Sequence, residues 1–297
     1  MKRFFFLLLA SLLLLAAAAG GGCAAVSALA PAADGARPVP ILMYHSILKD
    51  PARQGDYVLS PDVLDADVAW LLTNGYETVT LRALAAFAGG YGDLPAKPVL
   101  LTFDDGYLNN LLYALPVLEK YGCTAVISAV GAYTQAFSDT PDPNPNYAHL
   151  SWDDLIALQE SGRFEIGNHS YDMHGLSGRK GSSRRRGESD AAYRRAFTAD
   201  TARLQEALAR RVGVTPQFYA YPFGVVGEGS EACLREMGFL GSLTCREAVS
   251  TVVRGDPESL WGLGRFNRAS GETTDAFMRR TLGGVETGGA GDARPGA

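Results

Sequence analysis

The sequence predicts an α/β fold, a distorted barrel of the (β/α)7 type that forms a single catalytic domain. Short apolar runs alternate along the chain with amphipathic segments that carry helix-start and helix-stop signals, which is typical of parallel strands joined by helical crossovers. Chemically reactive residues stand just after the apolar runs, as they do at the strand ends of a barrel. The 297 residues are enough for one large domain with a sizeable core.

The expected strands are short apolar runs bounded by turn residues. In chain order they are residues 39–44, 78–81, 99–103, 125–130, 164–167, 217–220 and 240–243.

Helices are expected between these strands, where apolar residues recur at helical spacing. The first begins at Ser60-Pro61-Asp62, which supplies a cap, a proline at the first position and an acid in the first turn, and it ends at Gly75. The second follows the strand 78–81. The others cover residues 111–121, 152–161, 190–211 and 230–237.

Two motifs carry the chemistry. Residues 102–106 read Thr-Phe-Asp-Asp-Gly, and residues 169–174 read His-Ser-Tyr-Asp-Met-His. Where Gly106 lets the chain turn, Asp104 and Asp105 can both face one cavity, although neighbouring strand residues normally point apart. One carboxylate then serves a metal and the other a proton, and the histidines complete a mixed site of the kind that binds zinc. An ordinary acidic turn is the alternative interpretation.

From Pro38 to Gly283 the sequence resembles the polysaccharide deacetylases, the family 4 carbohydrate esterases that remove N-acetyl groups from amino sugars. The resemblance implies that Asp104 is the catalytic base. It also implies a divalent metal, Zn²⁺ or alternatively Co²⁺, Ni²⁺ or Mn²⁺, held by Asp105, His169 and His174. The two histidines are five residues apart, a spacing that resembles the branch acting on poly-β-1,6-N-acetylglucosamine.

The chain departs from the family pattern at the residue that usually orients the base. The family motif Arg-Pro-Pro-Tyr-Gly appears here as Ala-Tyr-Pro-Phe-Gly, so Ala220 stands where an arginine is usual. Arg265 and Arg268 are candidates to reach Asp104 instead, and we favour Arg268. A pair of surface arginines is the alternative.

The general acid also differs from the family pattern. No histidine follows His174 in the sequence, so the family's late histidine has no counterpart. His45 follows an apolar strand and is the residue that we expect to protonate the leaving amine, with His149 as the other candidate. A structural or substrate-contacting role for His45 is the alternative.

Contacts to the substrate or to the oxyanion are expected from Tyr221, Phe223 and Trp152. By resemblance, a backbone N–H near Phe223 contacts the oxyanion. Trp152 offers a sugar-stacking surface, unless it only packs at the start of its helix. Basic residues at 179–180 and 184–186 either attract anionic polymers or form a solvated loop without a partner, and we favour the solvated loop.

Residues 1–22 predict a lipoprotein-type signal peptide, because Lys2-Arg3 precede an apolar run that ends in three glycines and Cys23. A lipid on Cys23 would hold the protein on the membrane; plain secretion and an uncleaved anchor are the alternatives. We expect a flexible tether at 23–37, the deacetylase domain at 38–283 and a disordered tail at 284–297. The other three cysteines are odd in number and cannot all pair internally.

Together these observations predict a bacterial extracytoplasmic hydrolase, expected to be a monomer. It would remove N-acetyl groups from N-acetylglucosamine-containing polysaccharide (exopolysaccharide or peptidoglycan) and release acetate. The net charge of −5 argues against a nucleic-acid partner. The alternatives are a non-catalytic carbohydrate-binding protein of the cell envelope, a glycoside hydrolase, and a deacetylase of another acetylated glycan such as xylan.

Overall fold

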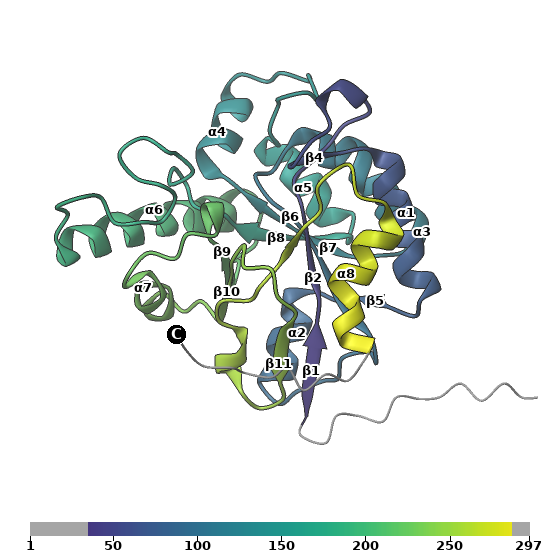
Figure 1. The fold of residues 1–297 in the computed structure, drawn as a ribbon. Coiled ribbons are helices and arrows are strands. Elements are labelled where there is room, and N and C mark those ends of the chain that lie inside the picture. Colours follow the sequence, from purple (N-terminus) through teal and green to yellow (C-terminus); the bar gives the residue numbers. More distant parts are fainter. Residues whose placement is uncertain (1–34, 287–297) are drawn as a thin grey trace, which may run out of the picture. The chain divides into compact units, whose positions relative to one another are not determined.

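A parallel β-sheet that curls into an incomplete barrel forms the centre of the structure, a computed structural model that describes residues 35–286 (Figure 1). Its strands follow the order β10-β9-β8-β7-β6-β2-β12, and β5 pairs with the start of β6. All of these pairings are parallel, as the sequence predicts. The strands are β2 (Ile41–Tyr44), β5 (Glu77–Thr78), β6 (Pro98–Phe103), β7 (Ala125–Ala129), β8 (Phe164–Asn168), β9 (Phe218–Ala220), β10 (Gly241–Leu243) and β12 (Phe266–Asn267).

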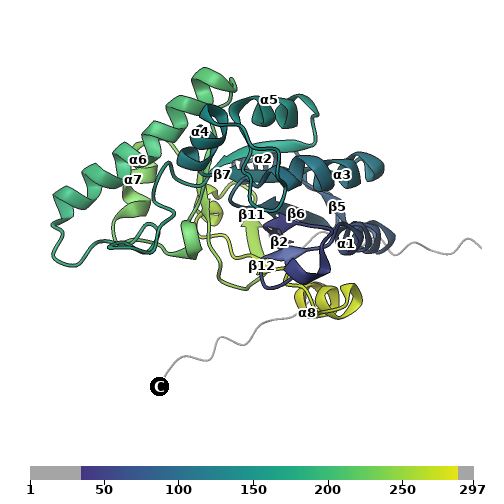
Figure 2. The ribbon, with the colours of Figure 1, turned by 90° about the horizontal axis from the view of Figure 1, so that it is seen from above.

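Helices connect the strands and cover the sheet. They are α1 (Pro61–Thr73), α2 (Leu81–Ala88), α3 (Leu115–Tyr121), α4 (Gly131–Asp139), α5 (Trp152–Glu160), α6 (Asp190–Arg211), α7 (Ser230–Glu236) and α8 (Thr274–Glu286). Figures 1 and 2 show α1, α3 and α8 together on one side of the sheet, away from α6 and α7. The expected cap of α1 is confirmed, because Ser60 Oγ accepts from the N–H of Val63.

Two small pairs of strands lie outside the central sheet. The strands β1 (Ala36–Val39) and β11 (Ser250–Val253) pair antiparallel. The strands β3 (Ser46–Ile47) and β4 (Val58–Leu59) pair in parallel.

Several predicted elements need correction. The elements β3, β4, α4, β11, β12 and α8 were not predicted from the sequence. The run 78–81 is not one strand, because the strand ends at Thr78 and Leu81 already begins α2. The helix predicted at 111–121 begins with a π-helical turn, Asn110–Ala114, before α3.

The outer limits of the domain also differ slightly from the prediction. Strand β1 begins at Ala36, inside the expected tether, and α8 continues to Glu286, three residues past Gly283. The signal peptide, Cys23 and the rest of the tether and tail lie outside the described residues. Between residues 35 and 286, no helix is long and apolar enough to cross a membrane.

Side chains of β6 alternate between two cores. Val99, Leu101 and Phe103 pack against the helices, whereas Leu100 joins an inner core that α2 and β11 close on the other side of the sheet. Since every second strand residue faces the same way, Asp104, just after the strand, continues the inner face of Leu100. The alternation therefore directs Asp104 into the barrel.

One segment connects the two edges of the sheet. Leu263 pairs in parallel with Leu243 of β10, and Phe266 then pairs with Leu42 of β2. Arg265 lies between these two pairings and is fully buried. The segment thus brings an arginine from late in the chain into the barrel interior.

Candidate active site

A cavity of about 420 Å³ opens at the carboxyl ends of the central strands. It brings together residues that are far apart in the sequence. Six of them were predicted as site residues: His45, Asp104, Asp105, His169, His174 and Phe223. The complete lining is Met43, His45, Tyr57, Asp104, Asp105, Tyr107, His169, His174, Lys180, Phe223, Cys245 and Asn267.

A buried ion pair holds Asp104. Nη1 and Nη2 of Arg265 donate to its Oδ1 and Oδ2 at 2.8 and 2.7 Å, and both side chains are buried. Nε of Arg265 donates to the carbonyl oxygen of Thr244 at 2.9 Å, which fixes the guanidinium plane. Burial by itself would raise the pKa of Asp104, but the guanidinium and nearby His169 outweigh it and lower the pKa. Asp104 is therefore held as a charged carboxylate at the cavity wall.

Asp105, His169 and His174 form a cluster that can hold a metal ion, with one ligand atom each and all three atoms within 4.8 Å of one another. Asp105 Oδ1 lies 3.4 Å from His169 Nε2 and 2.9 Å from His174 Nε2. Nδ1 of His169 lies 2.7 Å from the carbonyl oxygen of Ala220. Because a carbonyl only accepts, this nitrogen carries the hydrogen and Nε2 is left to bind a metal.

The charges of the cluster create a place for a cation. Burial raises the pKa of Asp105, but hydrogen bonds from His169 and His174 outweigh it and hold the pKa well below its ordinary value. Burial lowers the pKa of His169, whereas Asp104 and Asp105 raise it, and the net shift is upward. A divalent cation bound between these atoms would compensate the negative charge of Asp105, which protonated histidines compensate when no cation is bound.

Backbone strain is concentrated around the cavity. Among residues 35–286, three non-glycine residues have a positive φ: Asp105 (69°), Ser170 (71°) and Phe223 (58°). Each lies just past one of the strands β6, β8 and β9. Such conformations are costly and cluster at functional sites. At Asp105 the left-handed turn re-aims a side chain that would otherwise point away from the barrel, so that both carboxylates line one cavity.

Comparison with known proteins identifies the family. A model of the polysaccharide deacetylase family matches residues 91–241, just over half of the chain. The chain belongs to the polysaccharide deacetylase family.

Individual relatives of this family are more distant. The poly-β-1,6-N-acetyl-D-glucosamine N-deacetylase of Escherichia coli K12 is 25% identical over 221 residues, which cover 67% of this chain but only 32% of that protein. The Staphylococcus epidermidis protein of the same name is 22% identical over 214 residues, or 71% of this chain and 70% of the relative. The structure of a de-N-acetylase from Aggregatibacter actinomycetemcomitans superposes with a TM-score of 0.69 at 21% identity, covering 82% of this chain and 99% of that one. These matches confirm the deacetylase barrel.

The two candidate acids occupy different places in the structure. His45 lines the cavity, and its buried Nδ1 has no hydrogen-bond partner among the described residues. His149 lines a separate cavity of about 770 Å³ instead. It is stacked on Tyr107 with ring centroids 4.6 Å apart, and its Nδ1 is 2.9 Å from the carbonyl oxygen of Asp105. Burial lowers the pKa of both rings. His45 is therefore the candidate with access to substrate, and His149 supports the backbone of Asp105.

The prediction that Arg268 reaches Asp104 is wrong. Nε and Nη2 of Arg268 donate to the two carboxylate oxygens of Asp67 in α1, at 2.8 and 3.2 Å, and this pair is fully buried. Arg265 and Arg268 are three residues apart in an extended segment, so they point to opposite faces. Arg265 points into the barrel, and Arg268 points out toward the helices.

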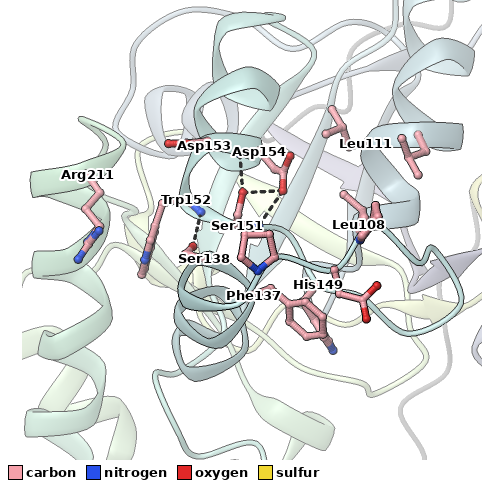
Figure 3. Close-up of a pocket in the computed structure, with 14 residues that line it drawn as sticks. Leu108, Leu111, Phe137, Ser138, His149, Ser151, Trp152, Asp153, Asp154 and Arg211 are labelled. Atoms are coloured by element: carbon pink, nitrogen blue, oxygen red, sulfur yellow. Dashed lines mark hydrogen bonds between the residues drawn. The ribbon is translucent and has the colours of Figure 1, made fainter.

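Two predicted substrate contacts are also wrong. Tyr221 is fully buried, and its hydroxyl lies 3.0 Å from Ser230 Oγ rather than in the cavity. Trp152 lines a separate cavity of about 770 Å³ (Figure 3). Only 3% of Trp152 is exposed, and its Nε1 donates to Gln135 Oε1 at 3.1 Å. Phe223 does line the site, with its ring centroid 4.6 Å from that of His174.

Two residues that line the cavity as possible substrate contacts, Tyr57 and Tyr107, were not predicted from the sequence, and Lys180 was predicted only as part of a basic loop. Tyr107 directly follows the Asp-Asp-Gly motif, and Tyr57 and Lys180 come from loops. Proximity to a motif could have indicated Tyr107. No local pattern marks Tyr57. Its loop is held at the site by contacts with distant residues: Asn267 Nδ2 donates to the Asp56 carbonyl at 2.8 Å, and the N–H of Ser46 donates to the Tyr57 carbonyl at 3.0 Å.

Proposed function

We propose that this chain is a metal-dependent hydrolase that removes N-acetyl groups from N-acetylglucosamine-containing polysaccharide and releases acetate. The observation that carries the proposal is the cluster of Asp105, His169 and His174 beside a second, separately held carboxylate, Asp104. Amide hydrolysis needs both, because one group must bind the cation and another must take a proton from water. Membership of the deacetylase family supports the same reaction.

Two imidazoles and one carboxylate fit a divalent metal, and we propose Zn²⁺, with Co²⁺, Ni²⁺ or Mn²⁺ as substitutes. The donors of this centre would be Asp105 Oδ1, His169 Nε2 and an imidazole nitrogen of His174. Such a cation, when bound, would polarise the acetyl carbonyl and acidify water. The hydrogen bond between His169 and Ala220 supports this assignment because it fixes the tautomer that leaves Nε2 free.

In the proposed reaction, side chains of this protein carry out each proton transfer. Asp104 accepts a proton from the water whose oxygen bonds to the acetyl carbon. The N–H of Phe223, which donates to no other group in the described part of the chain, faces the oxygen that becomes negative. His45 gives a proton to the sugar nitrogen as the carbon–nitrogen bond breaks, which leaves acetate and a free amine.

The remaining proposals concern where the protein works. We propose a bacterial extracytoplasmic location, by secretion or through a lipid on Cys23, with a wall or biofilm-matrix polysaccharide as partner. These proposals rest on the first residues of the sequence, which lie outside the described part of the chain.

Acetate release from a panel of polymers tests the function. The panel comprises β-1,6- and β-1,4-linked N-acetylglucosamine oligomers, peptidoglycan and acetylated xylan, each treated with zinc-reconstituted protein. Acetate from an N-acetylated glycan, abolished by a chelator and restored by zinc, is the expected result. Binding to these glycans without acetate from any of them would overturn the proposal in favour of a carbohydrate-binding protein. New reducing ends would indicate a glycoside hydrolase instead.

A further inference from the structure

Lys180 stands at the mouth of the active-site cavity without a counter-ion. It lines the cavity together with Tyr57 and Phe223, residues that are 60% and 37% exposed. Within residues 35–286, no carboxylate lies within ion-pair distance of its ammonium group, and none of the hydrogen bonds of the structure uses its Nζ atom. The rim of the site thus presents two apolar ring faces and one free positive charge.

The backbone around Lys180 is fixed, contrary to the solvated loop that the sequence analysis favoured. Arg179 is buried and pairs with Glu188 at 2.7 Å. On the other side, Ser182 is fully buried, its Oγ lies 3.2 Å from Tyr219 Oη, and its carbonyl accepts from Tyr193 Oη at 2.8 Å. Anchors on both sides hold the lysine at the cavity.

Gly181 packs closely against the turn at Pro222 and Phe223. Its φ is 53°, and a Cβ added there would lie 2.5 Å from the carbonyl oxygen of Pro222. Only glycine allows the backbone to approach the Pro222–Phe223 turn so closely. The position of Lys180 is therefore set by the turn that carries the rim residue Phe223.

The other charges of the site are already compensated. Asp104 is neutralised by Arg265, and Asp105 belongs to the cluster that attracts a cation. Lys180 adds a positive charge that nothing in the described chain balances. A neutral sugar hydroxyl can be bound by uncharged donors, whereas an ammonium group forms its strongest contact with an anion.

We propose that Lys180 makes the site selective for N-acetylated glycans that carry a carboxylate on a sugar next to the acetamido sugar. The acetamido sugar would stack on the exposed rings of Tyr57 and Phe223, and the carboxylate of its neighbour would meet the ammonium group. This inference rests on the proposed deacetylase function. It adds a preference for an anionic substrate, which neither the metal cluster nor the proposed base determines.

The test compares two forms of one substrate. Peptide-free peptidoglycan glycan strands carry free carboxylates, and the same strands after amidation of those carboxylates are neutral but otherwise matched. The readout is kcat/KM for acetate release on the anionic strand divided by kcat/KM on the amidated strand. The wild-type ratio should exceed one and should fall as ionic strength rises, because salt screens an exposed charge.

Three variants decide the role of the lysine. Lys180→Met keeps the length of the side chain and removes the charge, and it should lower the ratio by up to about fivefold, the range of a solvent-exposed ion pair. Lys180→Arg should keep most of the preference. Arg186→Ala removes an exposed charge from the same loop but outside the cavity, and its ratio should stay at the wild-type value.

An unchanged ratio in Lys180→Met, or an equal drop in Arg186→Ala, would overturn the proposal. Equilibrium binding of the two strands to Asp104→Asn protein, with and without Lys180→Met, measures the same preference without turnover. A preference in binding with no acetate from any glycan would therefore refute the deacetylase function but support the role of Lys180. Acetate release with no charge preference would support the deacetylase function and refute the role of Lys180.

Discussion

Replacement of Arg265 by methionine should remove the ion pair of Asp104, the proposed catalytic base. The guanidinium makes two hydrogen bonds to Asp104, at 2.8 and 2.7 Å, in a fully buried position. Removing one partner of a buried pair leaves the other charge without compensation, which costs about 3–5 kcal/mol of stability. Alternatively the carboxyl group takes up a proton, and the cost appears as a loss of activity.

The direction of the pH effect follows from the pKa of Asp104. In the wild type the pKa is lowered from 3.8, because Arg265 and His169 outweigh burial. A lowered pKa contributes stability above the unfolded value, and this contribution is lost as pH falls through the folded value. Without Arg265, the largest contribution that opposes burial is lost, and the pKa of Asp104 rises. The acid limb of kcat/KM should therefore move to higher pH, and the rate below that limb should fall by about 10²–10⁴ as the base is protonated.

Arg268→Met is the matched control. Arg268 is equally buried and also forms a two-contact ion pair, with Asp67 at 2.8 and 3.2 Å, but it does not touch the cavity. Both variants should lower the free energy of unfolding in urea by a similar amount. Only Arg265→Met should shift the pH profile of acetate release. The same profile in both variants, or a shift in Arg268→Met alone, would refute the reasoning.

Three further outcomes are expected. Asp105→Ala and His169→Ala should each lose bound metal, measured by atomic emission after dialysis against zinc, together with acetate release; full metal content in both would contradict the assigned cluster. His45→Gln should keep its metal but lose about 10²–10⁴ in kcat, and a wild-type rate would exclude His45 as the acid. Trp152→Phe should lower the free energy of unfolding by about 1 kcal/mol, because the hydrogen bond to Gln135 is lost. Its kcat/KM should not change, and a clear loss would reinstate Trp152 as a substrate contact.

Local signals in the sequence identified the elements that have strong caps and periodic apolar faces. Ser60 accepts from a backbone N–H group at the start of α1 as expected, and Ser151 does the same at the start of α5. Helix α4 was missed because Val130 at its N-cap gives no side-chain cap, and only Gly131 and Thr134 are buried in it. Strand β12 is two residues long, too short for any alternation to be visible.

By itself, the sequence indicated the three residues of the cluster that can hold a metal ion, because Asp105, His169 and His174 belong to two compact motifs. It also indicated that Asp104 and Asp105 can face one cavity where the chain turns at Gly106. Only the tertiary structure decided which arginine meets Asp104. That choice depends on the pairing of Phe266 with Leu42, which sets the face of Arg265, and such a register is fixed by the closure of the barrel and not by neighbouring residues. The placement of Lys180 depends in the same way on packing against a distant turn.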